Sequence, residues 1–323
     1  MQPFSYSRDL NDISSDRDMR FLAGGTTLID LMKLEVERPE LVIDITRNDR
    51  LRRIEIGDDG VRLGALVSMA EAADHHDIKQ RYPVVAQSLA LAASPQLRNM
   101  ASLAGNLLQR TRCMYFRDIS YAACNKRNPG SGCSALNGVN RIHAVLGTND
   151  NCIATYPGDF AQAMIALDGS VETNGPEGRR EIPVSKLHMP ASDRPDRETV
   201  LKPGEMIEAI KIPKGDFRRS LYLKIRDRQS YEFALASAAV ILNFDQGSVQ
   251  DARIALGGLA YRPWRAAEAE ETLRGQPLNE DQAQRAAEAA FAAARPQKHN
   301  AFKIELGKQT LIRALIAARD MEV

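Results

Sequence analysis

The stretch Phe21-Leu-Ala-Gly-Gly-Thr-Thr-Leu28 places two glycines and two threonines between a short apolar run and an amphipathic segment. Residues 19–23 are predicted to form a strand, and residues 28–35 are predicted to form a helix. A turn between a strand and a helix directs backbone N–H groups outward toward an anion, and glycine lets a phosphate approach closely. The stretch lacks the G-x-G-x-x-G spacing of a Rossmann fold, so an ordinary tight turn is an equal interpretation.

Three further groups of residues could contact the same ligand. Ser102-Leu-Ala-Gly-Asn-Leu107 is a second glycine turn, in which the amide of Asn106 could donate a hydrogen bond. Asp159 could accept from a sugar hydroxyl, although capping the helix predicted to follow it is the commoner role. Lys224 shares one face of a predicted strand with Arg226 and Arg228, and that face is either solvated or turned toward an anionic cofactor. Each group taken alone also fits a structural role.

All four cysteines of the chain lie in one segment, as Cys113, Cys124, Cys133 and Cys152. Four thiolates suit an iron–sulfur cube or a structural zinc ion. The loop between the second and third cysteine is rich in Gly and poor in apolar residues, so it requires an anchor. Zinc usually takes closely spaced ligand pairs, so the spacing favours a cluster over zinc, two disulfides or free core cysteines. His143 lies in the same segment and is interpreted as an exposed loop residue.

Composition excludes several classes of function. The 323 residues carry 43 Lys and Arg against 42 Asp and Glu, so no charge excess favours nucleic acid or a membrane surface. Aromatic residues make up only 6% of the chain, too few for the stacking platforms of single-strand binders. The longest apolar run, residues 233–244, is too short to cross a bilayer. The N-terminus shows no export signal, so export would need a signal carried by a partner.

The chain divides near residue 215 into two regions of different pattern. Residues 1–214 mix strands, helices and turns, with hairpins about Asp58-Asp-Gly60 and Asn174-Gly175. Residues 187–203 are rich in Pro, Asp and Arg and are predicted to be a loop. Residues 215–323 are predicted to form an α+β domain whose helices cover one face of a three-stranded sheet. Its predicted strands are 221–225, 233–244 and 249–260, and its predicted helices are 264–273, 280–294 and 301–321.

The order of these motifs resembles that of the FAD-binding subunits of the xanthine dehydrogenase, or molybdenum hydroxylase, family, over essentially the whole chain. The residues that carry the resemblance are Phe21–Leu28 with Asp30-Leu-Met-Lys33, Ala101-Ser-Leu-Ala-Gly-Asn-Leu107, Thr155-Tyr-Pro-Gly-Asp159, Tyr222-Leu-Lys-Ile-Arg-Asp-Arg228, and Ala255-Leu-Gly-Gly-Leu-Ala260 with Pro263-Trp264.

The resemblance implies an α+β, vanillyl-alcohol-oxidase-type (PCMH-type) FAD-binding domain of two subdomains, about residues 1–55 and 56–214. A C-terminal domain of the CO dehydrogenase flavoprotein type would follow over residues 215–323. The two glycine turns would hold the diphosphate and ribityl chain, Asp159 would bind a cofactor hydroxyl, and Lys224 would reach the flavin. The residues expected to contact FAD are Leu22, Ala23, Gly24, Gly25, Thr26, Thr27, Leu28, Ser102, Leu103, Gly105, Asn106, Leu107, Asp159 and Lys224.

The cysteine segment, about residues 110–152, is an insertion that most members of this family lack. It is similar to the FAD subunits of bacterial periplasmic aldehyde oxidoreductases and of 4-hydroxybenzoyl-CoA reductase, in which it carries an additional [4Fe–4S] cluster. The resemblance implies that Cys113, Cys124, Cys133 and Cys152 bind such a cluster. It also implies a periplasmic location, with the cytoplasm as the alternative. As a separate loop, the insertion is expected to lose iron but keep most FAD in a Cys124→Ser variant.

The function implied by the resemblance is electron transfer within a heterotrimeric molybdenum-containing aldehyde oxidoreductase or similar hydroxylase. A small subunit would supply two [2Fe–2S] clusters and a large subunit the molybdenum cofactor, because this chain has no cysteines left for [2Fe–2S] centres. Electrons would pass from those clusters to FAD held here and then to an external acceptor. No residue is predicted to be catalytic. The alternatives are a stand-alone flavin oxidase of the same fold and a non-redox nucleotide-binding module with structural zinc.

Overall fold

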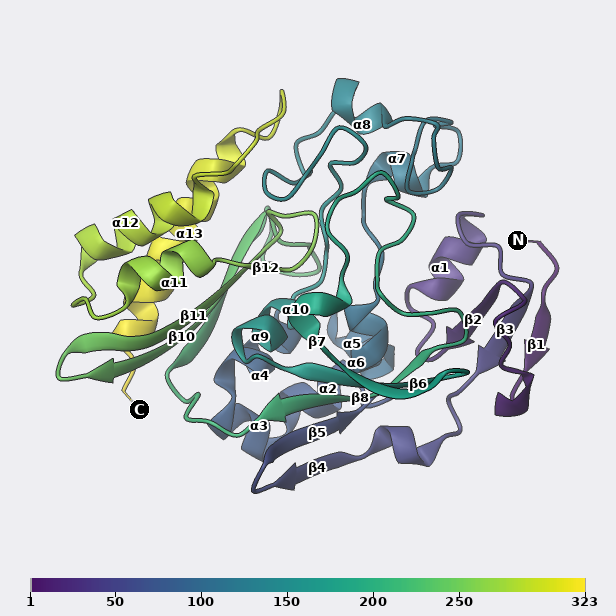
Figure 1. Cartoon of the computed structure of the whole chain (residues 1–323), viewed down its shortest axis with the longest axis horizontal. Coiled ribbons are helices and arrows are strands. Elements are labelled where there is room, and N and C mark those ends of the chain that lie inside the picture. The colour runs from purple at the N-terminus through teal and green to yellow at the C-terminus, as the bar shows by residue number, and fades with distance from the viewer. Residues whose placement is uncertain (1, 323) are drawn as a thin grey trace.

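A small parallel sheet forms the N-terminal part of the protein, whose computed structural model describes residues 2–322 (Figure 1). Its strands are β1 (Ser5–Ser7), β2 (Met19–Leu22) and β3 (Leu41–Asp44), in the order β1-β3-β2. The predicted strand–turn–helix unit is present, with α1 (Leu28–Lys33) after the glycine turn. Strand β1 was not predicted, because its three residues are too few and too exposed to show an alternating pattern.

A five-stranded antiparallel sheet forms the centre of the molecule, in the order β4-β5-β8-β6-β7. The hairpin of β4 (Ile54–Gly57) and β5 (Gly60–Gly64) and that of β6 (Ser170–Gly175) and β7 (Gly178–Pro183) are near the predicted turns. The central strand β8 (Met206–Pro213) was not predicted. It pairs with β5 and β6, so its position depends on contacts between residues far apart in the chain.

Short helices pack against this sheet and enclose the main core, with fully buried side chains such as Leu63, Tyr82 and Phe160. Ser68 begins the first of these helices in a capping box with Glu71. The helices are α2 (Met69–Asp74), α3 (His76–Arg81), α4 (Pro83–Ala90), α5 (Pro95–Met100), α6 (Leu103–Leu107), α9 (Phe160–Ala166) and α10 (Val184–Leu187).

The C-terminal domain is a four-stranded antiparallel sheet with three helices, not the three-stranded sheet expected. The order β12-β11-β10-β9 includes the two-residue strand β12 (Trp264–Arg265), in a stretch predicted to begin a helix. Such a short strand is fixed by pairing with β11 and leaves no pattern in the sequence. The other strands are β9 (Ser220–Ile225), β10 (Ala236–Asp245) and β11 (Ser248–Gly257). The helices are α11 (Ala267–Leu273), α12 (Glu280–Phe291) and α13 (Phe302–Arg319).

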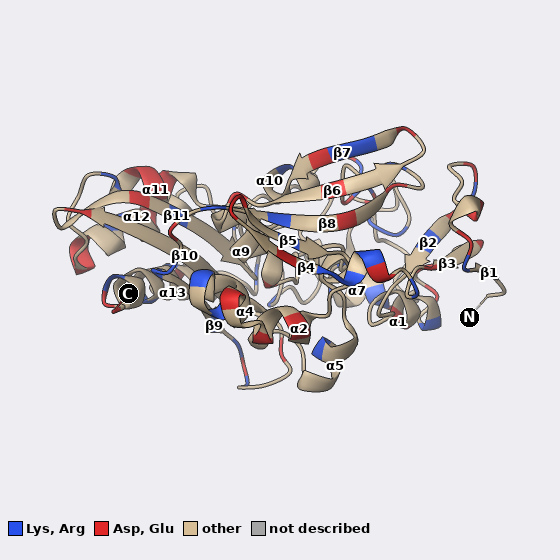
Figure 2. Cartoon of the chain, turned by 90° about the horizontal axis from the view of Figure 1, so that it is seen from below, with Lys and Arg blue, Asp and Glu red and all other residues tan. Residues whose placement is uncertain are grey.

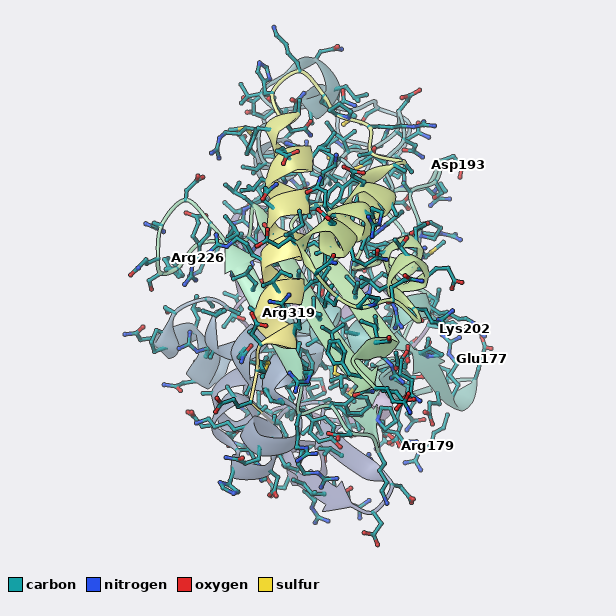
Figure 3. The ribbon with its side chains drawn as sticks, turned by 90° about the vertical axis from the view of Figure 1, so that its left-hand side faces the viewer. Glu177, Arg179, Asp193, Lys202, Arg226 and Arg319 are labelled. Atoms are coloured by element: carbon teal, nitrogen blue, oxygen red, sulfur yellow. The ribbon has the colours of Figure 1, made fainter. Side chains whose placement is uncertain are left out.

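Both faces of this sheet are covered by other parts of the protein, whereas the sequence predicted that helices cover only one face. Ala238, Val240 and Leu242 pack with helices α11–α13, and Ala239 and Ile241 pack into the main core. Because both faces of β10 are buried, its residues appear in the sequence as one continuous apolar run. Figure 3 shows α13 running along the outer face of the sheet, with Arg319 near its end. The predicted domain boundary falls in the link between β8 and β9, residues 214–219.

The cysteine insertion, residues 110–152, projects beside the C-terminal helices and contains α7 (Met114–Arg117) and α8 (Ser134–Asn137) (Figure 1). Helix α13 and the turn before it hold the later part of the insertion, since Lys303 donates to the carbonyls of Ile142 and His143 and Asn300 donates to that of His143. Lys and Arg residues are interspersed with Asp and Glu residues over the helices and strands (Figure 2). Within residues 2–322, none of the helices combines the length and apolarity needed to span a bilayer.

Candidate functional site

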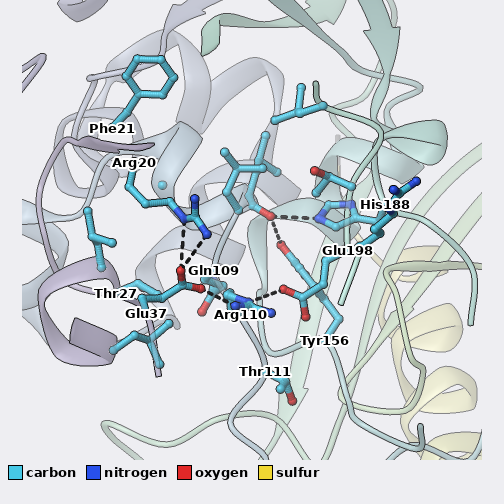
Figure 4. Close-up of a pocket in the computed structure, with 18 of the residues that line it drawn as sticks. Arg20, Phe21, Thr27, Glu37, Gln109, Arg110, Thr111, Tyr156, His188 and Glu198 are labelled. Carbon is cyan, nitrogen blue, oxygen red and sulfur yellow. Dashed lines mark hydrogen bonds and ion pairs between the residues drawn. The ribbon is translucent and has the colours of Figure 1, made fainter. Parts of the chain in front are cut away.

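A cleft of about 990 Å³ lies between the first subdomain and the central domain (Figure 4). The glycine turn after β2 forms one side, and the region around α6 forms another. The opposite side is formed by residues from the long loop after α10, here called the wall segment (residues 188–205). The volume lies within the range of pockets that hold large organic ligands or cofactors, about 300–1,000 Å³.

The glycine turn is fixed by a close backbone contact. A Cβ on Gly24 would lie 1.8 Å from the carbonyl oxygen of Met100, so no larger residue fits without moving the chain. Gly25 has a φ of +71°, a left-handed conformation that favours glycine. Within residues 2–322 the amides of Gly24, Gly25, Thr26 and Thr27 donate to no protein acceptor. Consecutive free amides of this kind are suited to an anionic group such as a phosphate.

The second turn is held in place by two aromatic side chains from other parts of the chain. The hydroxyl of Tyr156 donates to the carbonyl oxygen of Leu107 at 2.9 Å. His188 Nε2 also lies 2.9 Å from that oxygen, and its ring packs edge-on against Tyr156. Burial lowers the pKa of His188 to about 4, so the neutral imidazole donates through Nε2. Ser102 accepts from the amide of Gly105 at 3.2 Å and so caps α6.

A chain of alternating charges crosses the cleft from the first subdomain to the cysteine insertion (Figure 4). Glu37 pairs with Arg20 and with Arg110, and Arg110 Nε lies 2.6 Å from Glu198 Oε2. Lys126 Nζ lies 2.6 Å from the other oxygen of Glu198. Burial alone would raise the pKa of Glu198, but Lys126 and Arg110 lower it to about 2. Glu198 is therefore ionised at neutral pH.

The four cysteines line a second, smaller cavity behind the cleft. Cys113, Cys124 and Cys152 are buried, and Cys133 is partly buried. Burial raises the pKa of Cys113 to about 12 and that of Cys152 to about 11, so without a bound cation these two are neutral thiols. Within the described residues no group of three or more His, Cys, Asp or Glu side chains has the arrangement that holds a metal ion.

Comparison with known proteins decides the family. Residues 1–215 match the family described as "FAD binding domain in molybdopterin dehydrogenase", and residues 221–318 match "CO dehydrogenase flavoprotein C-terminal domain". The chain belongs to the FAD-binding subunits of the molybdenum hydroxylases. It is therefore an oxidoreductase subunit that binds FAD and transfers electrons within a complex that also has a small and a large subunit.

Individual relatives agree with this assignment over almost their full length. The FAD-binding subunit PaoB of Escherichia coli aldehyde oxidoreductase is 47% identical over 93% of this chain and 91% of the relative. The medium chain of carbon monoxide dehydrogenase from Hydrogenophaga pseudoflava is 27% identical over 93% of this chain and 89% of the relative. A solved structure of carbon monoxide dehydrogenase from the same organism superposes with a TM-score of 0.76 at 25% identity, covering 98% of both chains.

The cleft has the features that FAD requires. Free amides at the first turn can accept a diphosphate, and the cleft is long enough to extend from that turn past α6 to the wall segment. The predicted FAD residues that line the cleft are Ala23, Gly24, Gly25, Thr26, Thr27, Leu28, Ser102, Gly105 and Leu107.

Five predicted FAD residues do not line the cleft in this structure. Leu22 and Leu103 face away from it, and Asn106 Nδ2 contacts the sulfur of Met69 at 3.3 Å. Asp159 and Lys224 form an ion pair with each other, at 2.7 Å. Their contact with FAD stays a prediction, and the role visible here is to join the two domains.

Sequence reasoning was wrong about His143 and assigned no role to His188. His143 was expected to be exposed, but it is buried with Nε2 3.1 Å from Cys113 Sγ, and burial lowers its pKa to about 4. His188 had no visible partner in the sequence, yet it contacts the second turn. Sequence reasoning also missed Arg20, Glu37, Arg110 and Glu198, because isolated charged residues in loops give no signal until the fold brings them together.

Proposed function

We propose that this chain is the FAD subunit of a molybdenum-containing aldehyde oxidoreductase. The observation that carries the proposal is the 47% identity with PaoB over nearly the whole of both chains. Bound FAD would accept electrons from [2Fe–2S] clusters of the small subunit and release them to an external acceptor. The aldehyde itself would be oxidised on the large subunit, consistent with the absence of a predicted catalytic residue in this chain.

The residues of the cleft would hold and orient the cofactor. The amides of Gly24 to Thr27 would bind the diphosphate, and Ser102 to Leu107 would lie along the ribityl chain. Tyr156 and His188 keep the carbonyl of Leu107 in place, so the second turn is rigid before the cofactor arrives. The ion pair of Arg110 with Glu198 would hold the wall segment beside the cofactor.

We further propose that Cys113, Cys124, Cys133 and Cys152 bind a [4Fe–4S] cluster. Support comes from the shared cavity that all four cysteines line. On binding, the thiols would lose their protons to iron. The family assignment leaves the zinc-stabilised non-redox module without support.

The proposed complex contains one small [2Fe–2S] subunit and one large molybdenum subunit for each copy of this chain, and it resides in the periplasm after export of the folded complex. Cell fractionation tests the location. Activity released with periplasmic markers supports export, and activity that stays with cytoplasmic markers places the complex in the cytoplasm.

Co-expression with the genes of both partner subunits tests the function. The complex should contain FAD, molybdenum and acid-labile sulfide in excess of the amount needed for two [2Fe–2S] clusters, and it should oxidise aldehydes. The chain alone should contain FAD but leave aldehydes unchanged. Aldehyde oxidation by the isolated chain would instead identify a stand-alone flavin oxidase.

A further inference from the structure

The middle of the wall segment (residues 188–205) is held by contacts from the cysteine insertion, whereas Leu107 and Arg180 contact its two ends. Lys126 Nζ donates to the carbonyl oxygen of Pro195 at 3.1 Å and to Glu198. Asn149 Nδ2 donates to the carbonyl oxygen of Ser192 at 3.1 Å. The segment has no helix or strand of its own, so the position of its middle part, residues 192–198, depends on these contacts to the insertion.

Lys126 lies at the boundary between the two cavities. Together with Thr111 and Ala154 it lines both the cofactor cleft and the cysteine cavity. Its side chain is 4% exposed, and its ammonium group lies 4.7 Å from the ring centroid of Tyr261 and 3.1 Å from the hydroxyl of that residue. Because Lys126 is only two residues from Cys124, the position of its backbone depends on the position of that cysteine.

Glu198 connects this lysine to the other side of the cleft. One carboxylate oxygen contacts Lys126 and the other contacts Arg110, which in turn contacts Glu37 of the first subdomain. A displacement of the insertion would therefore either leave Glu198 with one partner or pull the wall segment with it. Both outcomes alter the surface that faces the cofactor, since Arg110 and Glu198 line the cleft.

We propose that Lys126 is a positioning residue that couples occupancy of the cysteine cavity to the affinity of the cleft for FAD. This inference rests on the proposed function and assigns to the insertion a role in shaping the flavin site. It replaces the expectation that the insertion behaves as a separate loop, so a Cys124→Ser variant should lose iron and bind FAD more weakly as well. Reciprocity requires that bound FAD also raise the affinity of the cysteine cavity for iron by the same factor.

The test uses the full chain in complex with its partner subunits and four variants. Lys126→Met removes the ammonium group and keeps a side chain of similar length. Glu198→Gln removes the negative charge of its partner and keeps the shape of that side chain. The double variant completes a double-mutant cycle. Lys211→Met, which breaks an exposed ion pair with Glu181 on the central sheet, is the control. Each is freed of FAD, titrated with FAD to obtain Kd, and assayed for iron and acid-labile sulfide.

We expect Lys126→Met and Glu198→Gln to keep their iron and to weaken FAD binding by roughly tenfold, a typical strength for coupling between sites. The double variant should be no weaker than the worse single variant, because both remove the same pair. Hydrogen exchange should quicken in residues 188–205 of the variants and not in the control. If Lys126→Met does not accumulate, Glu198→Gln alone gives the same comparison.

A chelator experiment on the wild-type complex tests the reciprocal effect. At equilibrium with the chelator, more iron should be retained with FAD bound than without, and in Lys126→Met the two amounts should be equal. The inference is overturned if Lys126→Met binds FAD as tightly as the control or if FAD leaves the amount of retained iron unchanged. A wild-type complex without FAD or without the additional acid-labile sulfide would instead refute the proposed function.

Discussion

Lys224 Nζ lies 2.7 Å from Asp159 Oδ2, and this buried ion pair joins the C-terminal domain to the central domain. The two side chains are 1% and 4% exposed. Lys224 also donates to the carbonyl oxygen of Leu91, and the hydroxyl of Tyr222 donates to the second oxygen of Asp159 at 2.7 Å. Every charged or polar atom of the pair is therefore satisfied within the protein, as a buried pair requires.

Replacing Lys224 with methionine should destabilise the protein strongly, because it leaves the carboxylate of Asp159 buried without a cation. Breaking a buried pair in this way costs about 3–5 kcal/mol. Urea unfolding of the FAD-free chain measures the loss, with the exposed Lys214→Met as a control that should change stability little. A loss below about 1 kcal/mol for Lys224→Met would show that the pair is not a structural link.

Substitution of Gly24 by alanine should abolish FAD binding by displacing the turn. The added Cβ would lie 1.8 Å from the carbonyl oxygen of Met100, so the backbone has to move. The control is Gly57→Ala, because a Cβ there meets no atom within 4 Å. FAD content after purification distinguishes the two. Normal FAD content in Gly24→Ala would mean that the turn tolerates the shift and does not position the cofactor.

Acid should weaken the charged network at the cleft. Glu198 has a pKa of about 2 in the folded protein and an ordinary value of 4.5 when unfolded. Its stabilising effect is therefore fully present above pH 4.5 and is lost as the pH falls toward 2. At roughly 1.36 kcal/mol per pKa unit, the effect amounts to about 3 kcal/mol.

Unfolding measurements across this pH range test that assignment. The stability of wild type should fall below pH 4.5 more steeply than that of Glu198→Gln, which cannot take up the proton. Parallel curves for the two proteins would show that Glu198 titrates normally and that its ion pairs are not formed in solution.

Lys303 should anchor the end of the insertion. It is fully buried, and its ammonium group donates to the carbonyl oxygens of Ile142, His143 and Gly258. Among residues 2–322 no acidic side chain pairs with it. Lys303→Met leaves these acceptors unsatisfied, at a cost of about 1–3 kcal/mol each before relaxation.

Hydrogen exchange in residues 140–146 measures the effect of Lys303→Met on the insertion. Exchange should be faster in that variant and unchanged in Lys308→Met on the same helix. Equal exchange in all three proteins would show that Asn300 and its neighbours hold the insertion without Lys303.

Much of the fold was predictable because its signals are local. The turn at Gly24 and Gly25, the Asp58-Asp-Gly60 hairpin and the helices of the C-terminal domain each follow from a short stretch of residues. Strands β8 and β12 were missed because pairing with distant strands defines them. The glycine turn was identified for its ability to bind phosphate, whereas the structure adds a second reason for Gly24, the contact with Met100.

The residues of the site could be predicted only where they belong to a recognisable sequence motif. Nine of the predicted FAD residues line the cleft, and all of these lie in the two glycine turns. The network of Glu37, Arg110 and Glu198 could not be seen, because its members come from three separate loops. Asp159 and Lys224 were linked to the cofactor by resemblance, and nothing in the sequence indicated that they would pair with each other.

Anaerobic mixing of aldehyde with the purified complex tests the central claim most directly. We predict that the flavin absorbance of this chain decreases when the small and large subunits are present and stays constant when the chain is mixed with aldehyde alone. Aldehyde oxidation by the complete complex with no reduction of the flavin would contradict the account, because electrons would then leave without passing through this subunit.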